Sequence, residues 1–322
     1  MERRPLGQTG LSVSRLCFGA LTIGPLQARL SPEEGGRVVR AAAEAGFNFF
    51  DTAELYGTYP HLRQGLAGFS DVHVASKSYA PDYEGMRASV EEALRALGVE
   101  AISVFLCHEL DSAAGLRGHA GALEYLVHAR ERGLVRAIGI STHAAEAVHA
   151  AALTPEIDVI HPLVNRAGLG VKGGLAAMQQ ALELAVATGK GLYTMKPLGG
   201  GHLRREAREA LAWCLNLPGV AAVAVGMRSA AEVALNAAWL AEATGGAEGS
   251  DAVELERLRR LVDQEERWLH VEAWCTGCGT CVAHCPAGAL RVREGRVTVD
   301  REKCLLCGYC GAACAEMALK VV

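Results

Sequence analysis

Two runs of cysteine near the end of the chain have the same spacing and could hold metal. Residues 274–290 read WCTGCGTCVAHCPAGAL, with cysteines at x2, x2 and x3 intervals, and the run over 304–314 repeats those intervals. The flanks CPAGALRV and CAEMALKV repeat as well. Zinc sites usually use two separated C-x2-C pairs, whereas a triple run with a fourth cysteine is typical of iron–sulfur sites. We therefore expect a duplicated half-domain that binds iron and sulfur.

A second set of reactive side chains lies much earlier, after short apolar runs that read as strands. Asp51 ends FNFFD and leads into DTAELYG, which contains Tyr56; Lys77 follows VHVAS, and His108 follows ISVFLC. Together they could reduce a carbonyl group, with Tyr56 giving the proton, Lys77 lowering the tyrosine pKa, Asp51 keeping the lysine charged and His108 orienting the oxygen. Each of these residue types alone is more often a solvent-exposed polar residue at the end of a strand. The presence of all four at successive strand ends favours the functional interpretation.

A βα repeat must position these residues. Strand-like runs alternate with helical segments about every 30 residues. The expected strands are residues 16–20, 47–51, 72–76, 102–107, 135–140, 157–161, 191–195 and 220–225. Eight such units favour a closed (β/α)8 barrel, an α/β fold whose reactive groups lie at the C-terminal strand ends. An open dinucleotide-binding sheet is disfavoured because FGALTIG lacks the G-x-G-x-x-G spacing.

Composition excludes several classes of function. The 322 residues are 50% hydrophobic and 21% charged, which is typical of a soluble chain with a large core. The net charge of -4 and scattered basic residues give no indication of nucleic acid, and no apolar run is long enough for a membrane span. We expect a cytoplasmic protein with reduced thiols. The other cysteines, Cys17, Cys107 and Cys214, lie singly in apolar stretches and are interpreted as small buried hydrophobes.

The barrel part of the chain resembles the aldo-keto reductase family in four sequence motifs. The resemblance covers roughly residues 3–240 and rests on FFDTAELYG, VASK, LCHEL and the opening RPLGQTGLSVSRLCFGA, which occur in family order. It implies a barrel with Tyr56 as general acid, Lys77 and Asp51 as its tuning pair and His108 as the orienting residue. It also implies a nicotinamide dinucleotide across the barrel mouth and a small-molecule carbonyl substrate.

The same resemblance suggests where the dinucleotide binds. Thr142 replaces the family's usual asparagine, His161 replaces a glutamine, and Leu235 replaces an acidic residue. Arg228 beside Ser229 at a helix start would suit a 2'-phosphate, although the pair could simply cap the helix, so NADPH is favoured over NADH. The expected cofactor-binding residues are Gly19, Ala20, Asp51, Ser141, Thr142, His161, Lys196, Pro197, Leu198, Gly226, Arg228, Ser229 and Asn236.

The cysteine runs resemble bacterial two-cluster ferredoxins, in which the fourth cysteine of each run serves the other cluster. The resemblance implies two 4Fe-4S clusters. One would be bound by Cys275, Cys278, Cys281 and Cys314, and the other by Cys304, Cys307, Cys310 and Cys285. Ala315 stands where the family has a proline, which changes the local turn and leaves the ligands intact.

We expect a barrel domain over residues 1–270, including an outer helix at about 251–269, and a ferredoxin-like α+β domain over 271–322. Three functions stay open. The chain could be an NADPH-linked carbonyl reductase with structural, redox-sensing or electron-transferring clusters, a reductase whose clusters feed electrons to a substrate in the mouth, or an electron-transfer protein with an inert barrel. The complete set of four polar residues argues against the third function; we favour the first and keep the second as the alternative. A redox protein partner stays open; nucleic acid and membrane partners are not expected.

Overall fold

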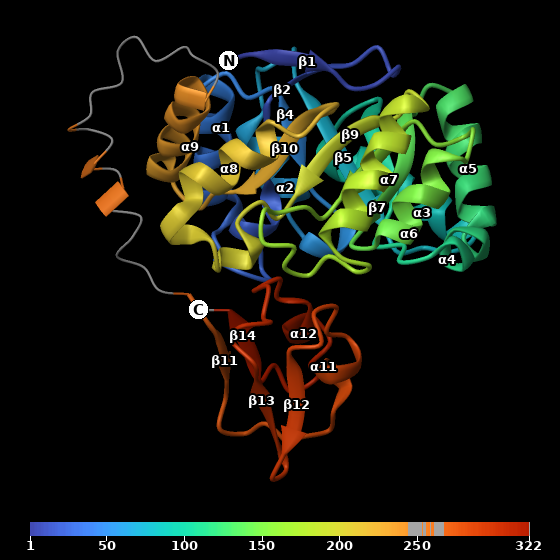
Figure 1. Cartoon of the computed structure of the whole chain (residues 1–322). Helices are drawn as coiled ribbons and strands as arrows, with labels where there is room; N and C mark the ends of the chain where they lie inside the picture. The colour runs from blue at the N-terminus through green and yellow to red at the C-terminus, as the bar shows by residue number, and fades with distance from the viewer. Residues whose placement is uncertain (244–252, 254–255, 258, 261–266, 322) are drawn as a thin grey trace.

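Eight parallel strands form a closed barrel in the computed structural model, which describes residues 1–243, 253, 256–257, 259–260 and 267–321 (Figure 1). The strands are β3 (Leu16–Gly19), β4 (Phe49–Asp51), β5 (His73–Ser78), β6 (Ile102–Cys107), β7 (Val135–Thr142), β8 (Val159–Pro162), β9 (Gly191–Met195) and β10 (Val220–Gly226). Parallel pairing of β10 with β3 closes the ring. The predicted (β/α)8 architecture is confirmed, with every expected strand present.

Helices cover the outside of this barrel. They are α1 (Pro32–Glu44), α2 (Tyr59–Gly65), α3 (Tyr83–Leu97), α4 (Ala113–Gly118), α5 (Ala120–Glu131), α6 (Ala145–Ala152), α7 (Leu175–Ala187), α8 (Ala207–Leu215) and α9 (Ala230–Ala243). The sequence explains their starts: Ser31 and Glu34 form a capping box before α1, and the Asp82 side chain accepts from Gly85 N at the start of α3. The short helix α4, inside the segment HELDSAAGLRG, was not expected.

A hairpin that the sequence analysis did not anticipate closes the N-terminal end of the barrel. Its strands are β1 (Arg3–Pro5) and β2 (Ser12–Ser14). Asn48 Oδ1 accepts from Ser14 N, and Asn48 Nδ2 donates to Ser12 O. Because Asn48 is used in this way, β4 begins at Phe49 rather than at the expected residue 47.

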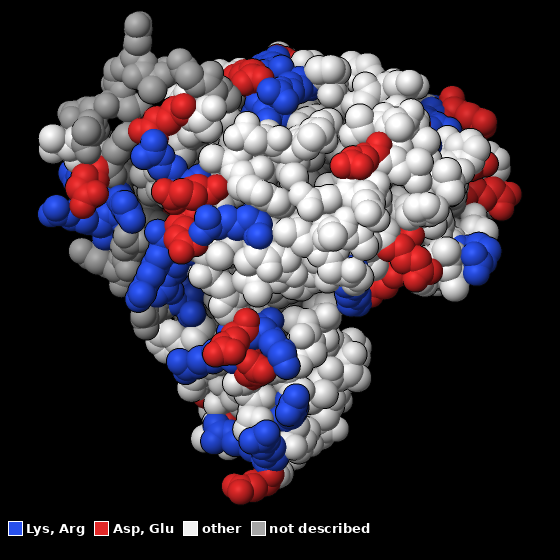
Figure 2. Space-filling view, viewed as in Figure 1, with Lys and Arg blue, Asp and Glu red and all other residues white. Residues whose placement is uncertain are grey.

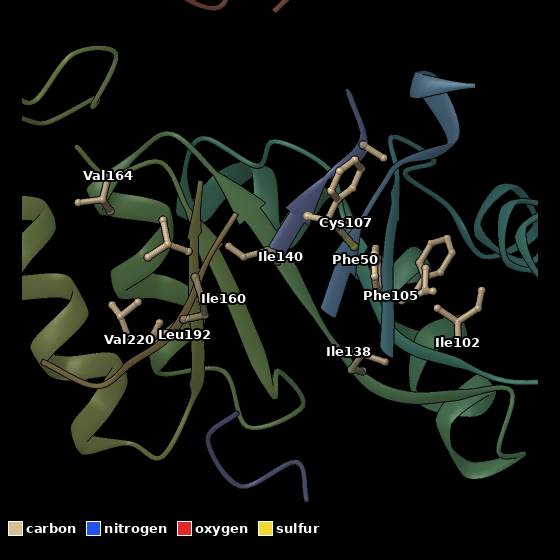
Figure 3. Close-up of a cluster of buried hydrophobic side chains, with 14 of the residues drawn as sticks. Phe50, Ile102, Phe105, Cys107, Ile138, Ile140, Ile160, Val164, Leu192 and Val220 are labelled. Carbon is tan, nitrogen blue, oxygen red and sulfur yellow. The ribbon is translucent and has the colours of Figure 1, made fainter. Parts of the chain in front are cut away.

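The apolar core has two parts. One fills the space between strands and helices and includes Phe50, Phe105, Ile138, Ile160 and Leu192 (Figure 3). The other lies inside the barrel and beneath the hairpin. The core fixes where each strand ends, and it therefore positions the polar residues that follow the strands.

The smaller C-terminal unit has two short sheets and two short helices. Antiparallel pairs join β11 (Leu269–Val271) to β14 (Leu319–Val321) and β12 (Leu290–Arg293) to β13 (Arg296–Val299). Helices α11 (Thr280–Ala283) and α12 (Tyr309–Ala312) occupy equivalent places in the two cysteine runs. The expected outer helix at 251–269 falls mostly outside the described residues. Within the described ranges, no helix has both the length and the apolar character to span a bilayer.

This ferredoxin-like unit is docked on the mouth of the barrel, below the C-terminal strand ends in Figure 1. Gln27 Nε2 donates to Leu306 O at 2.9 Å, and His202 Nε2 lies 2.7 Å from Cys304 O. Leu305 packs against Leu163 and Met195 of the barrel. The second cysteine run therefore faces the mouth.

Candidate active site

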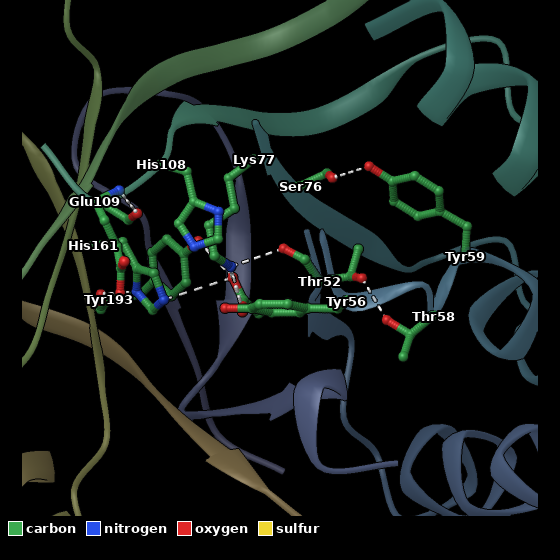
Figure 4. A network of polar contacts seen from close by, with 12 residues as sticks. Thr52, Tyr56, Thr58, Tyr59, Ser76, Lys77, His108, Glu109, His161 and Tyr193 are labelled. Atoms are coloured by element: carbon green, nitrogen blue, oxygen red, sulfur yellow. Dashed lines mark hydrogen bonds and ion pairs between the residues drawn. The ribbon is translucent and has the colours of Figure 1, made fainter. Parts of the chain in front are cut away.

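A buried lysine–aspartate pair lies at the centre of the mouth (Figure 4). Lys77 Nζ is 2.8 and 2.7 Å from the two oxygens of Asp51, and it also donates to Thr52 O at 2.7 Å. Tyr193 donates its hydroxyl to Asp51 Oδ1 at 3.0 Å. Both charged side chains are almost fully buried. The expected pairing of Lys77 with Asp51 is present, and each charge is satisfied by the other.

Tyr56 lies beside this pair, on the short helix η2 (Glu54–Tyr56), and Gly57 in the left-handed conformation ends that helix. Lys77 Nζ sits 4.9 Å from the centre of the Tyr56 ring rather than against its hydroxyl. Burial raises the pKa of Tyr56 well above its ordinary value, and the Asp51 charge raises it further. The expected lowering of this pKa by Lys77 is therefore wrong for this conformation, because Asp51 holds the ammonium.

His108 directly follows β6, on the other side of the mouth, and is buried. Its ring stacks on Tyr79, with centroids 4.2 Å apart, and meets the Tyr56 ring edge-on at 5.8 Å. Burial lowers the pKa of His108 well below its ordinary value, and the Lys77 charge adds to this effect. A neutral imidazole carries one N–H, so His108 can donate one hydrogen bond to an oxygen in the mouth.

Tyr309 of α12 completes the group, and the sequence analysis missed it. Its hydroxyl lies 3.4 Å from the Tyr56 hydroxyl and 3.4 Å from His108 Nε2. The ring packs with Ala53, Leu21 and Leu26 of the barrel. Tyr309, which lies in the second cysteine run, thus contacts both Tyr56 and His108, two of the predicted catalytic residues.

A second polar group borders the same space, and of its members only Lys196 was expected to have a functional role. His143 Nε2 lies 3.0 Å from Lys196 Nζ and 3.2 Å from Glu109 Oε1, and Tyr79 donates to Glu109 Oε2 at 2.6 Å. The contact between His143 and Glu109 is at ion-pair distance without hydrogen-bond geometry, since Glu109 Oε1 makes no hydrogen bond. Burial lowers the pKa of His143 well below its ordinary value. The local sequence gave no indication that these residues meet, because Tyr79, Glu109, His143 and Lys196 follow four different strands.

A cavity of about 750 Å³ runs from the mouth along one side of the barrel. Asp51 and Tyr56 line one end, and Arg228 and Asn236 line a more distant part. Of the expected cofactor-binding residues, nine line it: Gly19, Asp51, His161, Lys196, Pro197, Leu198, Gly226, Arg228 and Asn236. The cavity also meets Cys304 and Cys307 of the ferredoxin-like unit. Both domains therefore form its walls.

The other four expected residues have different surroundings. Ser141 Oγ accepts from Glu109 N, and Thr142 Oγ1 accepts from Ala144 N. Ser229 Oγ accepts from Glu232 N, as a helix cap does. Ala20 is buried at the start of a short helix. The side chains of the three hydroxyl residues thus bond to nearby backbone, and their contacts with a dinucleotide stay predictions.

The wall of the cavity carries a surplus of positive charge. Among the described residues that line it are Lys196 and seven arginines, against five carboxylates. Arg228 pairs with Glu232 at 3.3 Å, and Arg208 pairs with Glu242 at 3.0 Å. In Figure 2 charged side chains of both signs lie over α8 and α9, around the edge of the barrel and on the smaller unit, while most of the middle of the barrel face is uncharged. An anionic ligand fits such a cavity.

The pKa shifts of two clustered cysteines indicate which thiols lie near them, while the two expected ligand sets stay a prediction. Burial raises the pKa of Cys281, and the thiols of Cys314, Cys275 and Cys278 raise it further. Burial likewise raises the pKa of Cys310, with added contributions from Cys307, Cys304 and Cys285 and a smaller one from Cys281. The neighbours of each thiol include the fourth cysteine of the other run. In the described ranges no three ligand side chains converge on one point suited to a single ion. Four thiolates around a 4Fe-4S cluster each bind a different iron, so the grouping fits that donor set.

A (β/α)8 barrel with polar side chains at its strand ends, capped by a cysteine-rich unit, defines an oxidoreductase scaffold with an iron–sulfur domain. Residues 15–209 match the Aldo/keto reductase family, and residues 267–315 match the 4Fe-4S dicluster domain. The chain belongs to the aldo/keto reductase family, and both predicted resemblances are confirmed.

Individual relatives are distant. L-galactose dehydrogenase of Arabidopsis thaliana is 30% identical over 154 residues, which are 44% of this chain and 48% of that enzyme. An aldo-keto reductase of Mycolicibacterium smegmatis is 28% identical over 207 residues, covering 59% of this chain and 72% of the relative. The chain spans 48% to 66% of the length of the first three curated relatives that it matches.

Solved structures agree on the fold. An aldo-keto reductase from Pseudomonas aeruginosa superposes with a TM-score of 0.66 at 27% identity, over 75% of this chain and 95% of that one. Aldo-keto reductase AKR11C1 from Bacillus halodurans superposes with a TM-score of 0.63 at 21% identity. The superposition covers 81% of this chain and 96% of that one. These matches cover the barrel almost fully.

Proposed function

We propose that the protein is a cytoplasmic enzyme that reduces small carbonyl compounds, aldehydes, ketones or quinones, with NADPH. The observation that carries the proposal is one continuous cavity, which joins Asp51 and Tyr56 in the mouth to Arg228 and Asn236 beside α9. Its volume of about 750 Å³ and its cationic wall suit an elongated polyphosphate ligand. NADPH supplies a hydride when it is bound.

The chain's own residues then handle the proton. A carbonyl oxygen within hydrogen-bond reach of Tyr56 and His108 is polarised by both donors, and Tyr56 gives up its proton as negative charge develops on that oxygen. Lys77 lies 4.9 Å from the Tyr56 ring centre, where its ammonium lies over the ring rather than against the hydroxyl. Asp51 fixes the ammonium with two short contacts.

The test is oxidation of NADPH, followed by its absorbance at 340 nm, with a panel of aldehydes, ketones and quinones under anaerobic conditions. The proposal expects consumption of one NADPH for each alcohol or quinol formed. Binding of NADPH without turnover on any member of the panel would contradict it.

One observation favours a second candidate, in which the ferredoxin-like domain delivers electrons to the mouth. Cys304 and Cys307 line the same cavity as Tyr56. Reduction of a quinone then takes two electrons, one from each cluster, and two protons, and yields a quinol. Protein reduced with dithionite and freed of excess reductant would regain its oxidised absorbance when a quinone is added without nucleotide. No reoxidation beyond that of a buffer control would exclude this candidate.

A further inference from the structure

Tyr309 occupies the space that a carbonyl substrate needs. Its hydroxyl lies 3.4 Å from the Tyr56 hydroxyl and 3.4 Å from His108 Nε2. A carbonyl oxygen that accepts hydrogen bonds from both groups must lie about 2.7 to 3.2 Å from each. The Tyr309 oxygen lies beside the same two donors, so a carbonyl oxygen competes with it for them. The Tyr309 ring is buried and packs with Ala53 and Tyr56, which holds its hydroxyl in this place.

The dinucleotide cavity is not blocked in the same way. Its described lining includes Leu305, Leu306 and Cys307 of the ferredoxin-like domain, but Tyr309 is not among the lining residues. Lys196 lies next to both, since it lines the cavity and its Nζ lies 5.9 Å from the Tyr309 ring centre. The docked domain therefore leaves room for the nucleotide and fills the place of the substrate.

We propose that Tyr309 is a specificity-determining residue that mimics the substrate: a carbonyl compound is reduced only after it displaces this phenol from Tyr56 and His108. The inference rests on the proposed function, because it assumes that these two residues bind the carbonyl oxygen. The displaced side chain lies between two expected cluster ligands, Cys307 and Cys310, in the sequence.

The test compares Tyr309→Ala with the parent protein in benzaldehyde reduction. Loss of the whole phenol, both the ring and the hydroxyl that contacts two polar groups, should lower KM for benzaldehyde by about 10-fold, while kcat and the Kd for NADPH change less than about 2-fold. p-Cresol, which is the tyrosine side chain itself, should inhibit the variant competitively against benzaldehyde and leave the parent unaffected. Tyr125→Ala, which removes another buried phenol on α5 away from the mouth, serves as the matched control. In that control p-cresol should not compete with benzaldehyde.

Iron content is measured on every sample, because Tyr309 neighbours cluster ligands. Tyr309→Phe keeps the ring and removes only the hydroxyl, so its KM should fall by less than that of the alanine variant. An unchanged or raised KM in iron-replete samples of both variants would overturn the proposal.

A binding measurement separates this inference from the proposed function. Equilibrium dialysis of p-cresol against Tyr309→Ala needs no turnover, and benzaldehyde should displace the bound p-cresol. If no protein oxidises NADPH yet displacement occurs, the proposed function fails and the role of Tyr309 stands. If turnover occurs but benzaldehyde does not displace p-cresol, the role of Tyr309 fails.

Discussion

Gly200 of the barrel packs directly against the backbone of Leu305 in the ferredoxin-like domain. A Cβ built on Gly200 would lie 2.4 Å from Leu305 O, which is closer than atoms can approach. Gly200 also has φ +72°, a conformation that side chains rarely adopt. Gly308 makes the reciprocal fit, since its Cβ would lie 2.3 Å from Leu26 O. Glycines on both sides therefore let the two backbones meet over the active site.

Gly200→Ala should loosen this docking. The added methyl group collides with backbone rather than with a side chain that could turn away, so the radius of gyration from small-angle X-ray scattering should increase. Gly133→Ala is the matched control, because Gly133 has φ +73° and nothing within 4 Å of its Cβ position. Both variants should lose about 1 kcal/mol of stability from the backbone strain. Identical scattering from both variants would contradict the role given to Gly200.

The docking could have been inferred from the sequence, by comparing the two cysteine runs. The first reads CTGCGTC and the second CLLCGYC, so Thr276, Gly277 and Thr280 are replaced by Leu305, Leu306 and Tyr309. All three replacements contact the barrel, Leu305 and Tyr309 through side-chain packing and Leu306 through its carbonyl oxygen. When a repeat keeps its expected ligands and replaces polar residues between them by apolar ones, the replaced residues indicate a surface that binds another part of the protein.

The strands and the buried pair were predictable because they depend on local patterns. Alternation of strand and helix gave the barrel, and the C-terminal strand ends gave Asp51, Lys77 and His108. The pKa of Tyr56 was not predictable from the sequence, because it depends on whether the Lys77 ammonium faces the Tyr56 hydroxyl or Asp51. Hydrogen bonds such as that from Glu109 N to Ser141 Oγ are likewise set by tertiary packing, which no local pattern reveals.

Arg228 should carry much of any preference for NADPH. Arg228→Ala removes a guanidinium from the cavity wall, and loss of a charge-assisted contact to a 2'-phosphate should weaken NADPH binding by about 10- to 100-fold. NADH lacks that phosphate and should bind nearly as before. Fluorescence titration with both nucleotides measures this, with Arg87→Ala on α3 as a surface control. Equal weakening for both nucleotides would mean that Arg228 only supports its loop.

Single cysteine replacements should test the two ligand sets. The purified parent should hold about eight irons per chain. Cys314→Ala should abolish the cluster that involves Cys275, Cys278 and Cys281, and leave about four irons at the cluster near the barrel. Iron analysis with electron paramagnetic resonance of the reduced protein distinguishes the two clusters. Loss of the cluster near the barrel instead would show that each run binds its own cluster.

His161 should make the protein sensitive to acid. Burial lowers the pKa of His161 to about 4 from an ordinary value of 6.5, although the Asp51 charge opposes this. The unfolded state therefore binds more protons between these values, and the free energy of unfolding falls as pH decreases from about 6.5 to about 4. The loss should be on the order of 3 kcal/mol for this one residue.

His161→Gln keeps a donor toward Tyr193 O and cannot titrate. Urea unfolding of parent and variant between pH 7 and pH 4 measures the effect as a difference, so acid loss of the clusters affects both alike. The parent should lose more stability than the variant over this interval. Parallel losses would place the acid sensitivity elsewhere.

Replacement of Tyr56 by phenylalanine tests the central claim most directly, namely that Tyr56 gives the proton to a carbonyl oxygen in the barrel mouth. The change removes one hydroxyl and keeps the ring against Ala53, so iron content and NADPH binding should equal those of the parent. Anaerobic NADPH oxidation with aldehydes should then slow by about 10² to 10⁴, and quinones, which form more stable oxyanions, should be affected less. An unchanged aldehyde rate in the Tyr56→Phe protein would contradict the account.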